Sequence, residues 1–337
     1  MKKVLLIVLL ITLVLFSGIS YSFTDSTGRT VDLKKERIEN VAVTGPLAQM
    51  IVFALAPDKL VGFSTTMTEE EKEYFPQKYQ SLPVLGQLYG THGKLNLESL
   101  LSTHPDVIID MGEPKGSIEN DMDEIQKKTN IPTVHISCYL DSYGEAFRQL
   151  GKLLNMEKEA EVLAKYCEST YSSVLKDLED ISKKRCVYLL GDKGLNVIAN
   201  QSYHAELLNL LTDNIAVIDN PTSKGTGNEI DMEQLLIWQP EVIIFAPGSV
   251  YSKVARNYIW RGLKAIRTGN FYEVPSSPYN WLGFPPSVQR YLGMVWLETT
   301  LYPKESSFDV YKETSKFFNL FYHASLTREQ FEKIVGK

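Results

Sequence analysis

The sequence predicts an α/β protein built from two similar lobes with mostly parallel sheets, bridged by a long α-helix. Three observations support this fold class: a helix-to-strand segment occurs twice, its strands are apolar without alternation, and a helical segment without proline or glycine separates the two copies. The chain has 337 residues, more than one ordinary hydrophobic core accommodates. Two packed lobes are therefore expected.

The first 22 residues have the character of a secretory signal peptide. Lys2 and Lys3 precede an apolar run over 4–16, shorter than the about 20 residues that a membrane-spanning helix needs. Ser20 and Ser22 follow at the −3 and −1 positions of a small-residue cleavage site. We expect cleavage after Ser22, with an uncleaved membrane anchor as the alternative. With no lipid-anchor cysteine near the cut, a protein of the periplasm is the simplest expectation.

Composition excludes several classes of protein. Lys and Arg together number 35 and Asp and Glu 41, which gives a net charge of −6. Because binding to phosphates requires clustered cations, no nucleic-acid partner is expected. The three cysteines, Cys138, Cys167 and Cys186, lack the spacing of a metal site or redox motif, and we interpret them as buried structural thiols.

The duplication is the strongest internal signal. Residues 97–110 align with 232–245 at a constant offset of 135, and half of the 14 aligned positions are identical. Each copy predicts a short helix, a turn containing proline and a buried strand. The strand segments 107–109 and 242–245 are apolar on both faces, which is typical of parallel sheets covered by helices.

The remaining elements follow the same alternation in each half. The first half predicts a strand at 41–43, a helix at 47–55, a strand at 60–63 and another strand near 133; the second half predicts a strand at 186–190, a helix at 203–211, a strand at 215–218 and another near 273. We expect an N-terminal lobe over 23–143, a connecting helical segment over 144–184 as one long helix or two abutting ones, and a C-terminal lobe over 185–337.

With these segments in place, the chain resembles the substrate-binding proteins of ABC importers that have two Rossmann-like lobes bridged by one long helix. That family serves ferric siderophores, haem, corrinoids and other metal chelates. The resemblance rests on the two repeated segments, on His-Ala-Glu-Leu-Leu at 204–208, and on Pro-Pro-Ser-Val-Gln-Arg-Tyr-Leu-Gly at 285–293. It extends over nearly the whole chain after residue 22.

The resemblance implies a function. The chain would capture a metal chelate between its lobes and deliver it to the permease of an ABC importer, whose ATPase is a separate subunit. An iron–siderophore-like chelate is the first expectation, and haem, a corrinoid or a nickel or cobalt chelate are alternatives. No catalysis and no intrinsic cofactor are expected beyond this cargo. The rival hypotheses are a metal-dependent enzyme, or a ligand-free envelope sensor or scaffold, on the same fold.

Ligands of open α/β sheets bind beyond the carboxyl ends of the strands, so two facing lobes predict a cleft there. His92 lies in a glycine-flanked loop of the first lobe and is the candidate for contact with the metal or its chelator. An ordinary exposed loop histidine is the alternative. His204, near the start of a helix, is the second candidate, with capping of its own helix as the alternative.

Aromatic and cationic residues complete the predicted site. Tyr89, Tyr251, Tyr279 and Trp281 are candidates for gripping an organic ligand, unless the rings of the second lobe simply close its end. Arg290 follows the Pro-rich loop; if it faces the cleft it holds an anionic arm of the chelate, and otherwise it is a solvated helix arginine.

The resemblance also implies docking on the permease through one surface carboxylate in each lobe. Glu206 matches this position in the second lobe through its His-Ala-Glu-Leu-Leu context. Glu119 is the nearest match in the first lobe. The alternative for each is a solvated charge on a helix.

Overall fold

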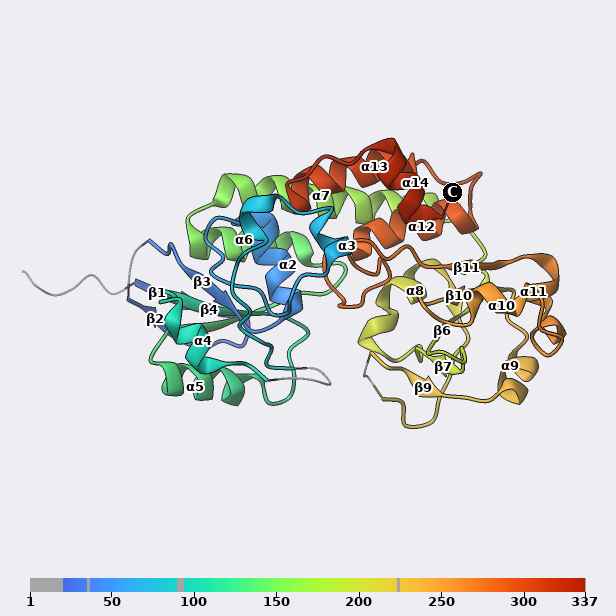
Figure 1. Cartoon of the computed structure of the whole chain (residues 1–337), viewed down its shortest axis with the longest axis horizontal. Helices are drawn as coiled ribbons and strands as arrows, with labels where there is room; N and C mark the ends of the chain where they lie inside the picture. Colours follow the sequence, from blue (N-terminus) through green and yellow to red (C-terminus); the bar gives the residue numbers. More distant parts are fainter. Residues whose placement is uncertain (1–20, 35–36, 90–93, 223–224, 337) are drawn as a thin grey trace, which may run out of the picture.

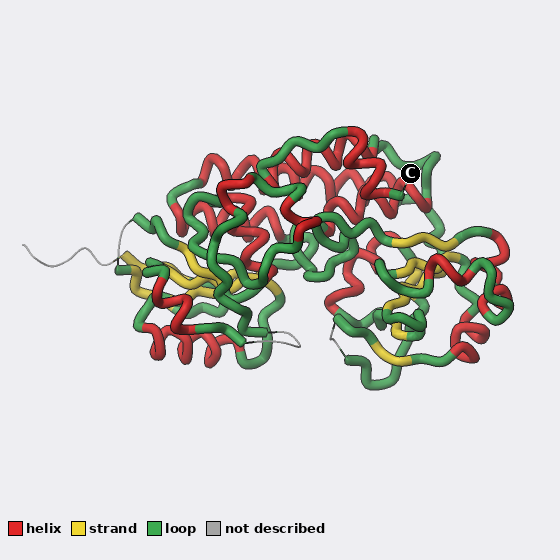
Figure 2. The backbone as a smooth tube through the Cα atoms, viewed as in Figure 1, coloured by secondary structure: helices red, strands yellow, loops and turns green. Residues whose placement is uncertain are grey.

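A computed structural model describes residues 21–34, 37–89, 94–222 and 225–336. Two α/β lobes lie beside one another, and a layer of helices runs along one side of both (Figures 1 and 2). Each lobe contains parallel strands with helices between them in sequence. The fold class predicted from the sequence is confirmed.

The first lobe is built on a three-stranded parallel sheet in the order β3 (Val41–Val43), β4 (Val107–Gly112), β5 (Thr133–Ser137). Every residue of β3 and β4 is buried, and all of them except Asp110 and Gly112 have apolar side chains, as parallel strands covered on both faces require. Its helices are α2 (Pro46–Leu55), α3 (Glu69–Lys72), the 3₁₀ helix η1 (Gln77–Tyr79), α4 (Leu97–Ser102) and α5 (Ile118–Thr129). The strand expected at 60–63 is reduced to single bridges at Leu60 and Phe63.

An antiparallel hairpin of β1 (Tyr21–Thr24) and β2 (Thr30–Leu33) precedes this sheet. Phe23 and Val31 are buried and fix the inner face of the hairpin. The cleavage site expected after Ser22 falls inside β1, and the rest of the expected signal peptide lies outside the described residues. Cleavage there would leave two of the four residues of this strand.

Three strands of the second lobe repeat the parallel arrangement of the first lobe. The strands of the second lobe are β6 (Arg185–Leu190), β7 (Asn196–Val197), β8 (Asp213–Asn214), β9 (Asn228–Glu229), β10 (Val242–Phe245) and β11 (Phe271–Glu273). The antiparallel strands β7 and β9 extend its sheet. β10 lies between β6 and β11 with parallel pairing, as β4 lies between β3 and β5. The duplication inferred from the sequence is therefore present in the pairing. No strand forms over 215–218, where one was expected; the two-residue strand β8 ends just before that range.

The helices of the second lobe are shorter, and none of them exceeds seven residues. They are the 3₁₀ helix η2 (Tyr203–Ala205), α8 (Glu206–Leu211), α9 (Met232–Trp238), α10 (Tyr251–Val254), the 3₁₀ helix η3 (Trp260–Gly262) and α11 (Lys264–Thr268). Asn96 and Asp231 cap the two repeated helices, α4 and α9, by accepting the backbone N–H three residues on. The repeat thus includes the start signal of its helix.

Two abutting helices connect the lobes, as the sequence predicts. α6 (Tyr143–Leu154) ends at Asn155, which adopts the left-handed conformation with φ 54°, and α7 (Glu157–Asp177) then runs along both lobes (Figure 1). The packed side of α7 includes Ala160, Ala164 and Cys167. All three cysteines are unpaired and buried, which confirms their structural interpretation.

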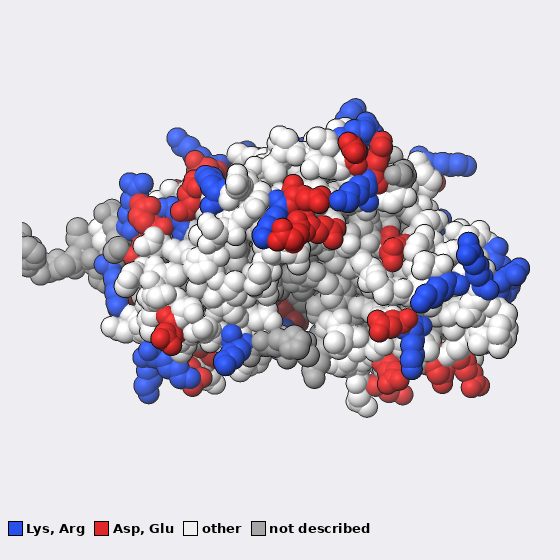
Figure 3. Space-filling view, in the orientation of Figure 1, with Lys and Arg blue, Asp and Glu red and all other residues white. Residues whose placement is uncertain are grey.

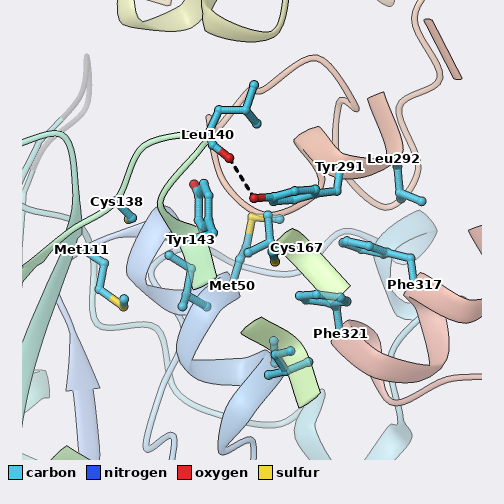
Figure 4. Close-up of a cluster of buried hydrophobic side chains, with 14 of the residues drawn as sticks. Met50, Met111, Cys138, Leu140, Tyr143, Cys167, Tyr291, Leu292, Phe317 and Phe321 are labelled. Carbon is cyan, nitrogen blue, oxygen red and sulfur yellow. Dashed lines mark hydrogen bonds between the residues drawn. The ribbon is translucent and has the colours of Figure 1, made fainter. Parts of the chain in front are cut away.

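The last helices of the chain, within the range over 185–337 expected for the second lobe, contact both lobes: the helix at 290–301 packs against α7 and α8, and the one at 318–322 packs against α2 of the first lobe. They are α12 (Arg290–Leu301), α13 (Val310–Phe317), the π-helix η4 (Phe318–Tyr322) and α14 (Arg328–Val335). Nε2 of His323 lies 3.1 Å from the carbonyl oxygen of Phe53 in α2, to which it donates when it carries the proton. Figure 4 shows Phe317 and Phe321 beside Met50, Tyr143 and Cys167 in one core.

Glu298 is a buried carboxyl group in α12. It is fully buried, and neither of its oxygens has a hydrogen-bond partner among the described residues. Burial raises the pKa of Glu298 to about 7, because a low-dielectric surrounding disfavours the charged form. The side chain therefore carries its proton in the folded protein at mildly acidic pH.

We predict that the free energy of unfolding falls as the pH rises from about 5 to about 8, because the unfolded state releases the proton of Glu298 more readily than the folded state. Glu298→Gln cannot titrate and should remove about 1–3 kcal/mol of this decline. Urea unfolding at both pH values measures it. The exposed Glu305→Gln is the control, and an equal pH dependence in all three proteins would contradict the prediction.

Candidate functional site

A pocket of about 740 Å³ lies between the lobes. Figure 3 shows the molecule hollowed there. The first lobe contributes Thr44, Gly45, Pro46, Leu47, Ala48, Gln87, Tyr89, Asp110, Met111, Gly112, Glu113 and Lys115, and the other wall contains Tyr203, His204, Gly225, Pro285 and Pro286. The first-lobe residues gather at the carboxyl ends of β3 and β4, where the parallel sheet predicts a ligand.

Asp110 is a buried carboxylate in the wall of this pocket, near the end of β4. The hydroxyl of Thr44 donates to its Oδ1, and Nδ1 of His135 lies 2.7 Å from its Oδ2. His135 is itself fully buried, with Nε2 3.2 Å from the hydroxyl of Ser137. These contacts hold the carboxylate in one orientation, so that it presents a fixed polar group to the pocket.

Three further polar groups of the first lobe face the same space. The hydroxyl of Tyr89 donates to Asp121 over 2.7 Å, which fixes the ring at the pocket wall. Nζ of Lys115 lies 3.1 Å from Glu113, and both side chains are partly exposed. The described lining therefore carries two carboxylates, Asp110 and Glu113, against the single cation Lys115, so that carboxylates are in excess.

His204 presents an imidazole from the opposite wall. Its ring stacks on Phe284 with the ring centroids 5.0 Å apart and the planes at 9°. Nδ1 lies 3.4 Å from the carbonyl oxygen of Gly283, to which it donates when it carries the proton. Burial lowers the pKa of His204. The imidazole is therefore neutral near pH 7, the form in which histidine coordinates metals.

Arg290 lies behind this wall and not in the pocket. It is fully buried at the start of α12, with Nη1 2.5 Å from Glu206 and Nη2 3.2 Å from the hydroxyl of Tyr203. The hydroxyl of Tyr143, from the first lobe, lies 3.5 Å from Nη2 and donates to the carbonyl of Pro286. The guanidinium thus joins elements of both lobes directly beneath the pocket lining.

The expected role of Arg290 is therefore corrected. A guanidinium that holds an anionic arm must reach the ligand, and this one is surrounded by Glu206, Tyr143 and Tyr203. It is also not a solvated helix arginine, the alternative considered from the sequence. Its contacts indicate a structural role at the junction of the lobes.

The predicted aromatic residues separate into two groups. Tyr89 lies in the pocket wall, together with the predicted His204. Trp281 is fully buried and donates its ring N–H to the carbonyl of Ser277 over 3.2 Å, so it belongs to the core. Tyr279 packs on Phe75 and Tyr322, and Tyr251 packs on Phe245 and Phe271. These three rings are not part of the described pocket lining.

His92 lies outside the described residues, so the structure gives no account of it. Sequence reasoning missed Gln87, Gly225 and the dipeptide Pro285–Pro286 as pocket residues. A sequence pattern could have indicated Pro285 and Pro286, because they end the predicted Pro-rich loop. No sequence pattern indicates Gly225 or Gln87, since their positions depend on how loops of the two lobes meet.

The two docking candidates differ in their surroundings. Glu119 is exposed in the first turn of α5. The side chain of Glu206, at the start of α8, is 26% exposed and already pairs with Arg290. A permease cation at Glu206 would therefore share this carboxylate with a buried arginine.

Comparison with known proteins identifies the class. The model of the periplasmic binding protein family matches residues 41–278. The chain belongs to this family, whose members are the substrate-binding components of ABC transporters. Among the described residues, no helix has both the length and the apolar character needed to cross a membrane.

Individual relatives have low sequence identity to this chain but align over most of its length. The Fe(3+)-citrate-binding protein YfmC of Bacillus subtilis is 23% identical over 79% of this chain and 87% of its own length. The structure of an ABC transporter solute-binding protein from Sulfurospirillum deleyianum is 27% identical, with a TM-score of 0.85 over 94% of this chain and 99% of that one. The molybdate-binding MolA of Haemophilus influenzae, at 20% identity, has a TM-score of 0.71 over 91% and 99% of the two chains.

We predict that Arg290→Met lowers the free energy of unfolding by about 3–5 kcal/mol, because it leaves Glu206 and two tyrosine hydroxyls without their cation in a buried site. Arg148→Met is the matched control. Arg148 pairs with Glu161 and Glu168 but is 36% exposed, so its loss should cost less than about 1 kcal/mol. Urea unfolding followed by circular dichroism compares the two, and equal losses would contradict the structural role of Arg290.

Proposed function

We propose that this protein captures a small metal chelate in the cleft between its lobes and delivers it to the permease of an ABC importer. The observation that carries this proposal is the pocket itself, in which fixed polar groups from both lobes converge at the carboxyl ends of parallel strands. An iron chelate is the first candidate cargo. The similarity to the Fe(3+)-citrate-binding protein of Bacillus subtilis supports it.

The size of the pocket suits a small ligand. Its volume of about 740 Å³ falls within the range of sites that enclose cofactor-sized or drug-sized molecules. The excess of carboxylates among Asp110, Glu113 and Lys115 disfavours a strongly anionic chelate, because like charges repel. The described lining therefore supports a metal complex whose chelator neutralises most of the charge of the metal.

The available donors also suit a chelate. A chelator occupies most coordination positions, so the protein needs to supply only one or two. The neutral imidazole of His204 is a donor accepted by iron, nickel and copper, and Asp110 supplies a hard oxygen. Because imidazole suits nickel as well as iron, a nickel or cobalt complex with a small chelator is the second candidate cargo.

We expect His204→Gln and Asp110→Asn each to weaken chelate binding by about 10- to 100-fold, since each removes a donor or a fixed charge at the pocket wall. Isothermal titration of the purified chain with ferric citrate, nickel–histidine and haem measures the affinities. Tyr251→Phe is the control, because Tyr251 lies away from the described lining. Unchanged affinity in both pocket variants would exclude these residues from binding, and no binding of any chelate would count against the proposed cargo.

Docking on the permease is tested separately from capture. We expect Glu119→Arg to reduce the ATPase stimulation of the importer, reconstituted in vesicles, by at least about tenfold while leaving chelate affinity unchanged, because a rim carboxylate mainly sets orientation and association rate. Glu124→Arg, on the same helix, is the matched control. Full stimulation by the Glu119→Arg variant would remove this carboxylate from the docking surface.

A further inference from the structure

One segment of the second lobe carries lysine and arginine side chains but no carboxylates. Residues 242–272 include no aspartate or glutamate, although the whole chain is acidic. The cations of this segment, which are all exposed and which we call the basic patch, are Lys253, Arg256, Arg261, Lys264 and Arg267. Figure 3 shows Lys and Arg side chains gathered over the part of the lobe that Figure 1 labels α10 and α11.

The fold directs these cations outward. The apolar residues between them, Val254, Trp260, Leu263, Ala265 and Ile266, are buried in the core of the second lobe. Nη1 of Arg267 donates to the carbonyls of Arg261 over 3.0 Å and Gly262 over 2.8 Å. This contact places Arg267 against the turn that carries Arg261, so that cations from separate short helices share one surface.

The charge of the basic patch is not neutralised locally. Within the part of the chain that the structure describes, none of its five cations forms an ion pair. The carboxylates that flank the segment in sequence are Glu241 and Glu273, and Glu241 accepts the backbone N–H of Arg185. The neighbouring helix α9 contains one acidic residue, Glu233, in its first turn. The patch therefore presents a net positive field to solvent.

Two apolar side chains, Tyr258 and Ile259, project from the surface between the cations of the basic patch. Tyr258 is 85% exposed and Ile259 is 42% exposed. The side chain of Asn257 accepts the backbone N–H groups of Ile259 over 2.9 Å and Trp260 over 3.4 Å, which fixes the turn. Leu236 of α9 lies beside Gly262, and its neighbour Ile237 is 70% exposed.

We propose that the basic patch, together with Tyr258 and Ile259, binds the anionic headgroups of a phospholipid membrane surface. Lysine and arginine attract anionic lipids, and tyrosine and aliphatic side chains enter the headgroup region. An acidic protein would satisfy the cations but would leave the protruding apolar turn unexplained. The lipid surface accounts for both, and this inference does not depend on the cargo in the cleft.

Vesicle flotation of the purified chain tests the proposal. We expect binding to vesicles of phosphatidylglycerol mixed with phosphatidylcholine, none to phosphatidylcholine alone, and weakening as salt is added. Arg261→Gln with Lys264→Gln should lower the partition coefficient by about tenfold, and Tyr258→Ser should lower it several-fold. The matched control, Lys312→Gln with Lys316→Gln on α13, should bind as the unmodified chain does.

Thermal unfolding and chelate titration confirm that the variants are folded, since none of the changed residues lies in the described pocket lining. Absence of binding to the anionic vesicles would overturn the proposal, and so would an equal loss in the α13 control. Binding to soluble polyglutamate as strong as to vesicles and insensitive to Tyr258→Ser would indicate an acidic protein partner instead. Self-association in sedimentation velocity that is lost in the patch variants would indicate an interface between copies.

Discussion

The need to cover apolar strands on both faces governs this structure. β4 and β10, the two copies of the repeated strand, are buried along their whole length. A polar side chain on either face would therefore lose its hydrogen bonds to water and would need a partner within the protein. Helices must then cover each sheet on both sides, and polar chemistry is confined to the strand ends. Asp110 illustrates this: it lies near the end of β4, where Thr44 and His135 satisfy its carboxylate and the pocket begins.

The two copies of the repeat are joined by more than the connecting helix. Arg290 contacts Glu206 and Tyr203 on one side and Tyr143 on the other, and the last of these hydroxyls reaches Pro286 in the pocket wall. Buried charge clusters of this kind contribute little to the net free energy of unfolding, but they require their members to keep one relative arrangement. Such a cluster fixes the spacing of the pocket walls, because any shift of one lobe would separate the cation from its partners.

The sequence predicted the parts of this structure that depend on local pattern. The repeated helix and strand, the apolar character of β4 and β10, and the rule that ligands lie beyond strand ends together predicted the cleft, and Tyr89 and His204 were expected to face it. Arg290 and Trp281 were misjudged because the orientation of a residue near the start of α12 depends on how that helix packs against both lobes. No periodicity in the local sequence records such packing.

The return of the C-terminal helices to the first lobe affects how the chain reaches its folded state. Phe321 packs on Phe147, and His323 contacts Phe53, so the core around α2 and α6 is completed by residues from the far end of the chain. Contacts between distant parts of a chain form slowly, because a long loop must close first. The amino-terminal half cannot finish its core while the ribosome still holds the last helices. A delay of this kind leaves the amino-terminal half of a newly made chain incompletely folded until its synthesis ends.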